Sequence, residues 1–143
     1  MRYAYPYEVL PEKEGGFFIS FPDVPEALSG AADEQAIESM AQDALLAALS
    51  FYTDSGDMAP APSAAHGRRV VILPITVALK LALHDAMRRA GMSNVALAQR
   101  LGTDEKSVRR LRDPLHGSRV EAIEAALLAL GCRAEVTVQG RAA

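Results

Sequence analysis

The stretch ALAQRLGTDEKSVRRLRDP, residues 96–114, decides the fold of the C-terminal half. It has the pattern of two short helices joined by a tight turn. Two helices that cross steeply need a small residue at the crossing, a glycine in the turn and a buried apolar residue in the second helix. Ala98, Gly102 and Val108 meet these needs at relative positions 0, +4 and +10. The stretch therefore predicts a helix-turn-helix, with a plain helical hairpin as the alternative.

The second helix of this pair carries side chains that suit DNA. Arg109 and Arg110 can enter the major groove and fork onto guanine, whereas Lys106 and Arg112 suit phosphate. Glu105 can accept from cytosine, but we prefer a role at the positive helix N-terminus. A solvated polar face is the alternative for each arginine alone. The predicted DNA contacts are Ser93, Asn94, Glu105, Lys106, Ser107, Arg109, Arg110 and Arg112.

Apolar residues at helical spacing predict two further helices around this pair. One opens at Pro74 or Thr76 and ends at Gly91, and the other is capped by Ser118 and ends at Gly131. Ser93 and Asp104 are the predicted caps of the two helices between them.

The sequence RAEVTVQ, residues 133–139, alternates apolar and polar residues and predicts a terminal strand. Ala134, Val136 and Val138 would share one face. Such a strand can add to its copy across a two-fold axis and pair two DNA-binding modules, or it can fold back on its own module. Both alternatives stay open.

The N-terminal half has the pattern of a small sheet covered by one helix. Asp33 is a predicted helix cap, and Tyr3, Tyr5 and Tyr7 are expected to line a sheet face. The predicted elements are strands over 2–10, 16–21 and 26–31, a helix over 34–52, a mobile loop over 53–67 and a strand over 68–75. The predicted fold class is thus α+β, with a β-β-β-α-β module over 1–73 and an all-α module with a terminal strand over 74–143.

Charge divides the chain at nearly the same place. Residues 1–67 hold two basic residues against eleven acidic ones, a net charge of −9, and residues 68–143 hold thirteen against seven, a net charge of +6. Opposite fields suggest two modules with different partners. An acidic module repels nucleic acid and suits a basic protein, whose active surface it can cover.

No motif points to catalysis, a metal or a cofactor. There is no phosphate-binding glycine loop, zinc signature or Ser-His-Asp arrangement. His66, His84 and His116 are expected to be structural or solvent-facing. A lone Cys132 excludes an internal disulfide and fits a cytoplasmic protein, and no apolar run suits a membrane span. We therefore predict a protein that is not an enzyme.

Three stretches, taken in order, give the chain a resemblance to a known family. They are YPYEVLPEKEGGFFISFPDVPEALSGAADEQAI, VILPITVALKLALHDAMRRAGMS and ALAQRLGTDEKSVRRLRDPLHGSRVEAIEAALLALG. Together they resemble the HicB family of bacterial antitoxins, in the variant with a C-terminal helix-turn-helix.

The resemblance implies a division of labour between the modules. The N-terminal module would be a degraded, inactive RNase H-like domain that binds and inhibits a HicA toxin, a small basic ribonuclease that cleaves mRNA. The C-terminal Xre/Cro-like module would bind and repress the operon's own promoter, as a dimer or tetramer. A ligand-responsive transcription regulator is the alternative, and a large apolar pocket in residues 1–73 would favour it. An active RNase H-like nuclease is a third hypothesis, which a carboxylate cluster would favour.

Overall fold

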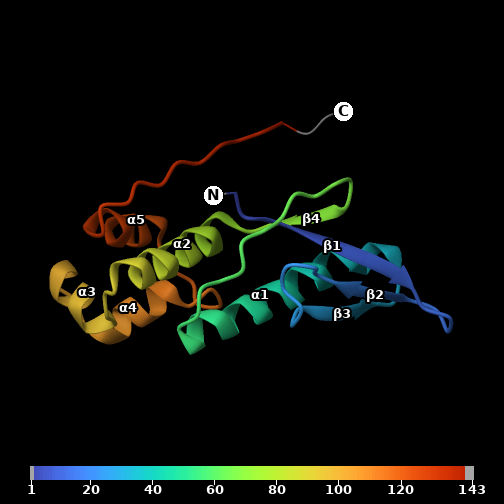
Figure 1. Cartoon of the computed structure of the whole chain (residues 1–143), viewed down its shortest axis with the longest axis horizontal. Coiled ribbons are helices and arrows are strands. Elements are labelled where there is room, and N and C mark those ends of the chain that lie inside the picture. Colours follow the sequence, from blue (N-terminus) through green and yellow to red (C-terminus); the bar gives the residue numbers. More distant parts are fainter. Residues whose placement is uncertain (1, 141–143) are drawn as a thin grey trace.

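The computed structural model describes residues 2–140 and has an α+β fold, with an antiparallel sheet followed by helices (Figure 1). The sheet and its helix α1 lie at one end of an elongated molecule, and helices α3 to α5 lie at the other end. Helix α2 lies between them.

Four strands form one antiparallel sheet. They are β1 (Ala4–Pro11), β2 (Phe17–Ser20), β3 (Leu28–Ala31) and β4 (Arg69–Ile72), in the order β3-β2-β1-β4. The predicted succession of three strands, a helix and a strand is confirmed.

Pro6 lies inside β1 without costing the sheet a hydrogen bond. The amide of Leu73 donates to Tyr3, so the odd-numbered residues of β1 direct their peptide groups toward β4. Pro6 therefore faces the other side, which β2 reaches only from Glu8 onward. The missing N–H falls where β1 has no neighbour, in agreement with the local edge that proline requires.

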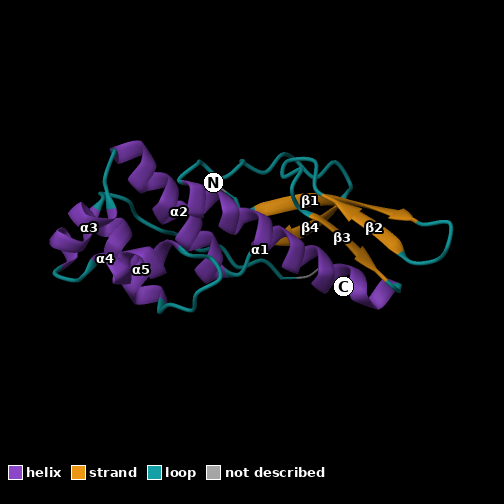
Figure 2. Ribbon diagram, turned by 90° about the horizontal axis from the view of Figure 1, so that it is seen from below, coloured by secondary structure: helices purple, strands orange, loops and turns teal. Residues whose placement is uncertain are grey.

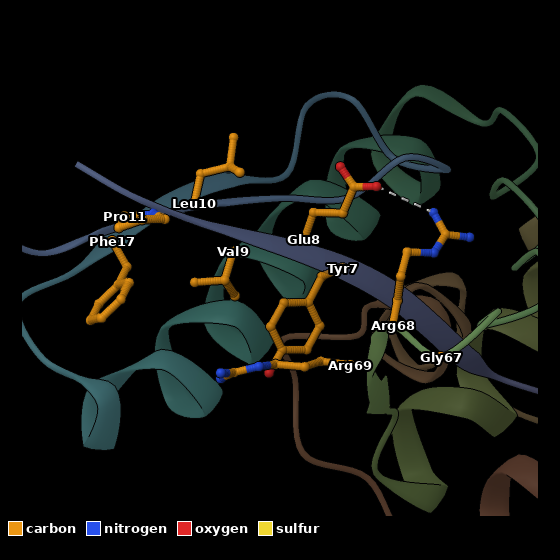
Figure 3. A pocket seen from close by; sticks show the side chains of 9 residues that line it. All are labelled: Tyr7, Glu8, Val9, Leu10, Pro11, Phe17, Gly67, Arg68 and Arg69. Carbon is orange, nitrogen blue, oxygen red and sulfur yellow. Dashed lines mark ion pairs between the residues drawn. The ribbon is translucent and has the colours of Figure 1, made fainter. Parts of the chain in front are cut away.

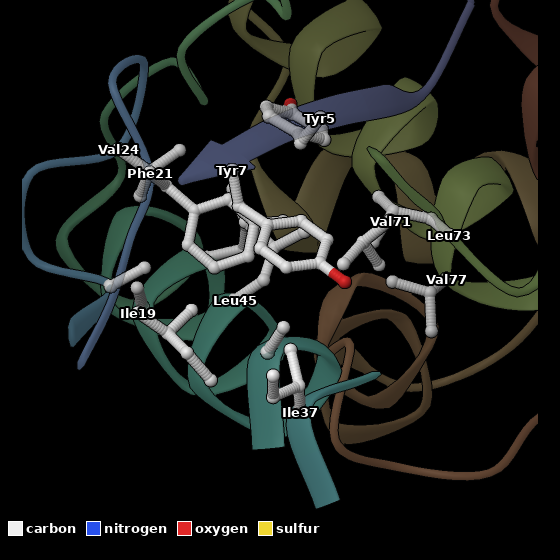
Figure 4. Packing of buried hydrophobic residues seen from close by; sticks show 14 of the residues in the cluster. Tyr5, Tyr7, Ile19, Phe21, Val24, Ile37, Leu45, Val71, Leu73 and Val77 are labelled. Atoms are coloured by element: carbon white, nitrogen blue, oxygen red, sulfur yellow. The ribbon is translucent and has the colours of Figure 1, made fainter. Parts of the chain in front are cut away.

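Helix α1 (Ile37–Ser55) covers one face of the sheet (Figure 2). A short 3-10 turn, Glu34–Ala36, precedes it, and the Asp33 carboxylate accepts from the Ala36 amide as predicted. The buried side of α1 packs on the aromatic and branched residues of the sheet (Figure 4). Buried members of this first core include Tyr5, Tyr7, Ile19, Phe21, Ile37, Leu45, Leu49 and Val71.

The segment after α1 is shorter than predicted and is held to the sheet module. Helix α1 runs to Ser55, three residues into the predicted loop. The Tyr5 hydroxyl donates to the carbonyl of Pro60 at 2.7 Å, and the amide and hydroxyl of Ser63 both donate to Asp23. These bonds differ from the expectation of a free, mobile loop.

Four helices make up the rest of the described chain. They are α2 (Ile75–Ala90), α3 (Asn94–Leu101), α4 (Glu105–Arg112) and α5 (Val120–Ala129). Ser93 and Asp104 cap α3 and α4 as predicted. Ser118 does not cap α5, which contradicts the prediction: Arg119 takes the cap position, and the Ser118 hydroxyl accepts from Lys80 instead.

A second core holds these helices together. It includes Leu83, Met87, Leu97, Ala98, Val108, Leu111, Ile123 and Leu127. Helix α2 belongs to both cores, because Val77 and Leu81 pack on the sheet side while Leu83 and Met87 pack among the other helices. The two halves of the molecule are therefore joined by one continuous helix.

The predicted terminal strand is wrong for the single chain. Residues 132–140 form neither helix nor strand, although they are drawn out in an extended path beyond α5 (Figure 1). A strand requires hydrogen bonds to a neighbouring strand, and no strand of the described chain pairs with this segment.

Candidate functional site

Helices α3 and α4 form a compact pair around the residues that the sequence singles out. Ala98 and Val108 are buried between the helices, and Gly102 ends α3 in the left-handed region with φ of 69°. A residue with a Cβ is strained in that conformation. The small residue, the glycine and the buried valine thus occupy the places that the spacing predicts.

The start of α4 is stabilised by its own acidic residues. The Asp104 carboxylate accepts from the Ser107 amide at 2.7 Å, and hydrogen bonding from the side chain and then the backbone of Ser107 lowers the pKa of Asp104. Glu105 forms an ion pair with Arg109, four residues later, at 2.8 Å. The acid at the head of this helix therefore has a local structural use.

Helix α4 presents a basic outer face. Lys106, Arg109 and Arg110 are exposed, and Arg109 keeps 67% of its side chain exposed despite its ion pair with Glu105. Arg110 forms no ion pair within the described chain. Glu105 is exposed beside them, and Ser107 is half-buried. Lys106 and Arg110 are thus free to meet an external anion, and Arg109 remains largely exposed beside them.

Arg112 lies on the other side of α4 and turns inward. Its guanidinium donates to the Asn94 side-chain oxygen at 2.6 Å and meets His84 Nδ1 at 2.6 Å. Burial lowers the pKa of Arg112. Arg112 and Asn94, both predicted DNA contacts, are therefore not on the exposed basic face but bond to each other inside the protein. The Ser93 hydroxyl, also a predicted DNA contact, accepts from the Ala96 amide.

His84 is the centre of this buried polar group. It is fully buried in α2, and its Nε2 lies 2.7 Å from the carbonyl oxygen of Asp57. A guanidinium has only donors, so His84 Nδ1 accepts from Arg112 and Nε2–H donates to Asp57. Burial lowers the pKa of His84, and Arg112 adds to that effect. His84 is therefore a neutral, structural histidine, one of the two roles expected for it.

Lys80 is a second buried polar residue that sequence reasoning missed. Its ammonium donates to the Arg110 carbonyl and to the Ser118 hydroxyl, both at 2.7 Å, and burial lowers its pKa. It thereby joins α2 to the last turn of α4. The signal was present: Lys80 and His84 are four residues apart on the same side of a helix as Val77 and Leu81.

The predicted dimerisation residues differ in exposure. Ala134 packs partly against the second core, whereas Val136 and Val138 are 57% and 89% exposed. Two valines on an extended segment without strand partners are available to another chain.

The N-terminal half offers an acidic surface with an apolar centre. Met40, Ala47 and Phe51 lie outward on α1, since positions 40, 47 and 51 share one helical face. Phe51 is 65% exposed. Asp43 and Asp54 flank them, are exposed and form no ion pair within the described chain. We call these five residues the α1 face.

A shallow hollow lies along β1, between Phe17 of β2 and the start of β4. It has a volume of about 440 Å³ and is open to solvent. Figure 3 shows that Glu8, Arg68 and Arg69 line it together with Leu10 and other residues of β1, and that Glu8 and Arg68 form an ion pair. An open hollow with three charged walls differs from the large apolar pocket that a ligand sensor needs.

Within residues 2–140, no group of three or more His, Cys, Asp or Glu side chains is placed to hold a metal ion. No helix in that part of the chain is long and apolar enough to cross a membrane.

Known proteins resemble the chain along most of its length. The model of a family described as "HicB_like antitoxin of bacterial toxin-antitoxin system" matches residues 4–82. "Antitoxin HicB 1" of Photorhabdus laumondii is 34% identical over 136 residues, which cover 94% of this chain and 86% of that protein. "Antitoxin HicB" of Escherichia coli K12 is 35% identical over 129 residues, with coverage of 89% and 93%.

A third relative extends the match to nearly the full length of both proteins. "Antitoxin HicB" of Pseudomonas fluorescens is 35% identical over 142 residues, or 97% of this chain and 96% of that protein. These relatives are regulatory antitoxins, so the prediction that the protein is not an enzyme is confirmed. The chain therefore belongs to the HicB-like antitoxin family.

Proposed function

We propose that the protein neutralises a HicA-type mRNA-cleaving toxin with its N-terminal module and represses its own operon by binding promoter DNA with its C-terminal module. The observation that carries this proposal is the division of charge. The sheet module, residues 1–73, holds four basic and eleven acidic residues, a net charge of −7, and residues 74–143 hold eleven basic and seven acidic residues, a net charge of +4. Each part has its own packed core, and α2 contributes to both. An acidic unit suits a basic ribonuclease, and a basic unit suits DNA.

Toxin inhibition in this proposal is steric and electrostatic. The N-terminal module, residues 1–73, is a partial RNase H-like domain that covers the basic RNA-binding surface of the toxin without any chemistry of its own. The α1 face fits this role, because its exposed Phe51 and Met40 supply an apolar anchor and its two unpaired aspartates attract a cation.

DNA binding in this proposal uses α3 and α4 as a helix-turn-helix of the Xre/Cro type. Arg109 and Arg110 approach base edges, Lys106 contacts phosphate, and the start of α3 at Ser93 offers free amides to a second phosphate. Arg112 and Asn94 serve a different purpose, since both are engaged inside the protein. They hold the reading helix in place.

Self-association completes the DNA-binding unit. One short reading helix binds weakly, whereas two that are spaced for adjacent half-sites bind much more tightly. We propose that Val136 and Val138 pair the extended segment with its copy across a two-fold axis, which would convert it into a strand.

The open hollow beside β1 favours an antitoxin and repressor over a ligand-responsive regulator, because the hollow is not enclosed by apolar walls as a ligand-sensing pocket would be.

Toxin binding is tested with the product of the adjacent reading frame, which this proposal expects to be a small basic protein. Co-expression should restore growth, and Phe51→Ala should weaken toxin binding about tenfold or more in calorimetry, as for an exposed aromatic anchor that becomes buried. Leu10→Ala is the matched control, since Leu10 is 59% exposed on the opposite side of the sheet. An adjacent protein that is not toxic, or that the chain does not bind, would refute the antitoxin proposal.

DNA binding is tested separately with the promoter fragment. Arg109→Ala and Arg110→Ala should each weaken binding by about 1–3 kcal/mol if they read bases, while toxin neutralisation stays intact. Equal loss of both activities in these variants would contradict two separable modules.

A further inference from the structure

A line of hydrogen bonds joins the end of α1 to both helices of the α3–α4 pair. It runs from the Asp57 carbonyl to His84, from His84 to Arg112, and from Arg112 to Asn94, with separations of 2.7, 2.6 and 2.6 Å. Four segments of the chain therefore meet through two side chains, and the line crosses from one core to the other.

The first link is anchored by the cap of α1. Gly56 takes the left-handed conformation with φ of 80°, and its amide donates to Thr53. The Asp57 amide donates back to Tyr52 at 2.9 Å. These paired bonds form a Schellman cap, which holds the amide of Asp57 on the last turn of α1 and so places its carbonyl next to that turn. A displacement of α1 therefore displaces the acceptor of His84.

The middle of the line tolerates little change. His84 is fully buried, and each ring nitrogen has one partner of fixed polarity, so the ring cannot flip without losing both bonds. Arg112 forms no ion pair with a carboxylate of residues 2–140, and its Nε is buried without a hydrogen bond. The guanidinium thus depends on Asn94 and His84 for its position.

The far end of the line reaches the DNA-reading elements. Asn94 is the first residue of α3, and Arg112 is the last residue of α4, two positions after Arg110. The two bonds of Arg112 therefore set the start of one helix against the end of the other.

Resting on the proposed function, we propose that His84 and Arg112 are positioning residues that transmit the displacement of α1 by a bound toxin to the reading helix, and so change the affinity for the operator. A basic partner on the α1 face contacts the same helix whose cap holds His84. Coupling between two binding sites requires an element that both sites bias, and this line supplies it.

Two substitutions of His84 cut the line on opposite sides. The amide of asparagine is placed near the position of Nδ1, so His84→Asn keeps a partner for Arg112 and loses Asp57. The longer glutamine places its amide near Nε2, so His84→Gln keeps Asp57 and loses Arg112. If His84 only stabilised the fold, the two variants would bind the operator alike, with and without toxin. The same two substitutions at His116, an exposed turn residue, are the matched controls.

The experiment measures the operator affinity of the full chain with and without saturating toxin. We expect toxin to change the affinity of the wild-type protein by about fivefold or more. In His84→Asn the affinity without toxin should stay within about twofold of wild type, while the effect of toxin disappears. In His84→Gln the affinity without toxin should already fall about tenfold, the equivalent of one hydrogen bond to a charged group.

The outcomes separate this inference from the proposed function. A wild-type chain that binds neither toxin nor operator refutes the proposed function. A chain that binds both, but shows the full effect of toxin in His84→Asn or no effect of toxin in the wild type, refutes the relay alone. Asn94→Ala provides a second variant if a His84 variant fails to fold, as judged by its melting temperature; it should reduce the effect of toxin, and an unchanged effect would overturn the proposal.

Discussion

His84 remains neutral in the folded protein because a charged ring would be costly at its position. Its pKa is lowered from an ordinary 6.5 mainly by burial, with Arg112 and Arg88 adding to the effect and the Asp57 carbonyl and Asp85 opposing it. Protonation of Nδ1 would also set a donor against the donors of Arg112. Protonation of His84 at low pH would therefore break its bond to Arg112 and weaken the contact between the two modules.

The free energy of unfolding should decrease as the pH falls below about 6.5. In that range the unfolded chain binds a proton that the folded His84 does not, so acid favours unfolding, at no more than about 1.4 kcal/mol per pH unit for one proton. Urea titrations at pH 7.5 and 5.5 measure it. Asp85 acts oppositely at lower pH, because burial raises its pKa. An equally large decrease in His84→Asn would contradict the assignment.

At the scale of elements, the last turn of α4 depends on a residue from α2. The final carbonyls of a helix lack partners within it, and here Lys80 donates to the Arg110 carbonyl while the Asp113 amide approaches the same oxygen. A cation at a helix C-terminus is also favoured by the helix dipole. Helix α4 is thus stabilised from inside the protein, and its outer face remains exposed.

Lys80→Met should destabilise the protein by about 2 kcal/mol, because it leaves the Arg110 carbonyl and the Ser118 hydroxyl without their charged donor. The methionine fills a similar volume, so loss of packing contributes little. Urea unfolding provides the measurement. Lys106→Met is the matched control on the exposed side of α4, with an expected change below about 0.5 kcal/mol. Equal stability of the two variants would contradict the role of Lys80.

Short-range patterns predicted most elements correctly. The caps at Asp33, Ser93 and Asp104 were predicted because a side chain bonds to an amide three residues away. Ser118 follows the same sequence rule, yet its hydroxyl accepts from the buried ammonium of Lys80 and does not cap α5. Local rules fail where a distant residue competes for the same atom.

At the scale of the whole molecule, α2 joins two modules of opposite charge, because its residues pack in the core of each. The extended segment after α5 leaves the body of the protein with Val136 and Val138 exposed (Figure 1). Exposed valines on a segment of β-type alternation favour addition to another strand.

Val136→Asp combined with Val138→Asp should abolish self-association and weaken operator binding, because like charges would face one another in the paired strands. The stability of each chain should change by less than about 0.5 kcal/mol, since both side chains are exposed. Sedimentation measures the mass, and operator titration measures the affinity. An unchanged mass would indicate a dimer interface elsewhere.

The sequence by itself determined the order of strands and helices as far as α5, the caps at Asp33, Ser93 and Asp104, the turn at Gly102 and the basic face of α4, because each depends on residues within a few positions of one another. Only the tertiary structure decided that Arg112 and Asn94 face inward, that Lys80 and His84 are buried, and that residues 132–140 have no strand partner in one chain. The physical reason is that a polar side chain is buried when distant segments supply its hydrogen bonds, and the spacing of residues along one helix does not specify those segments.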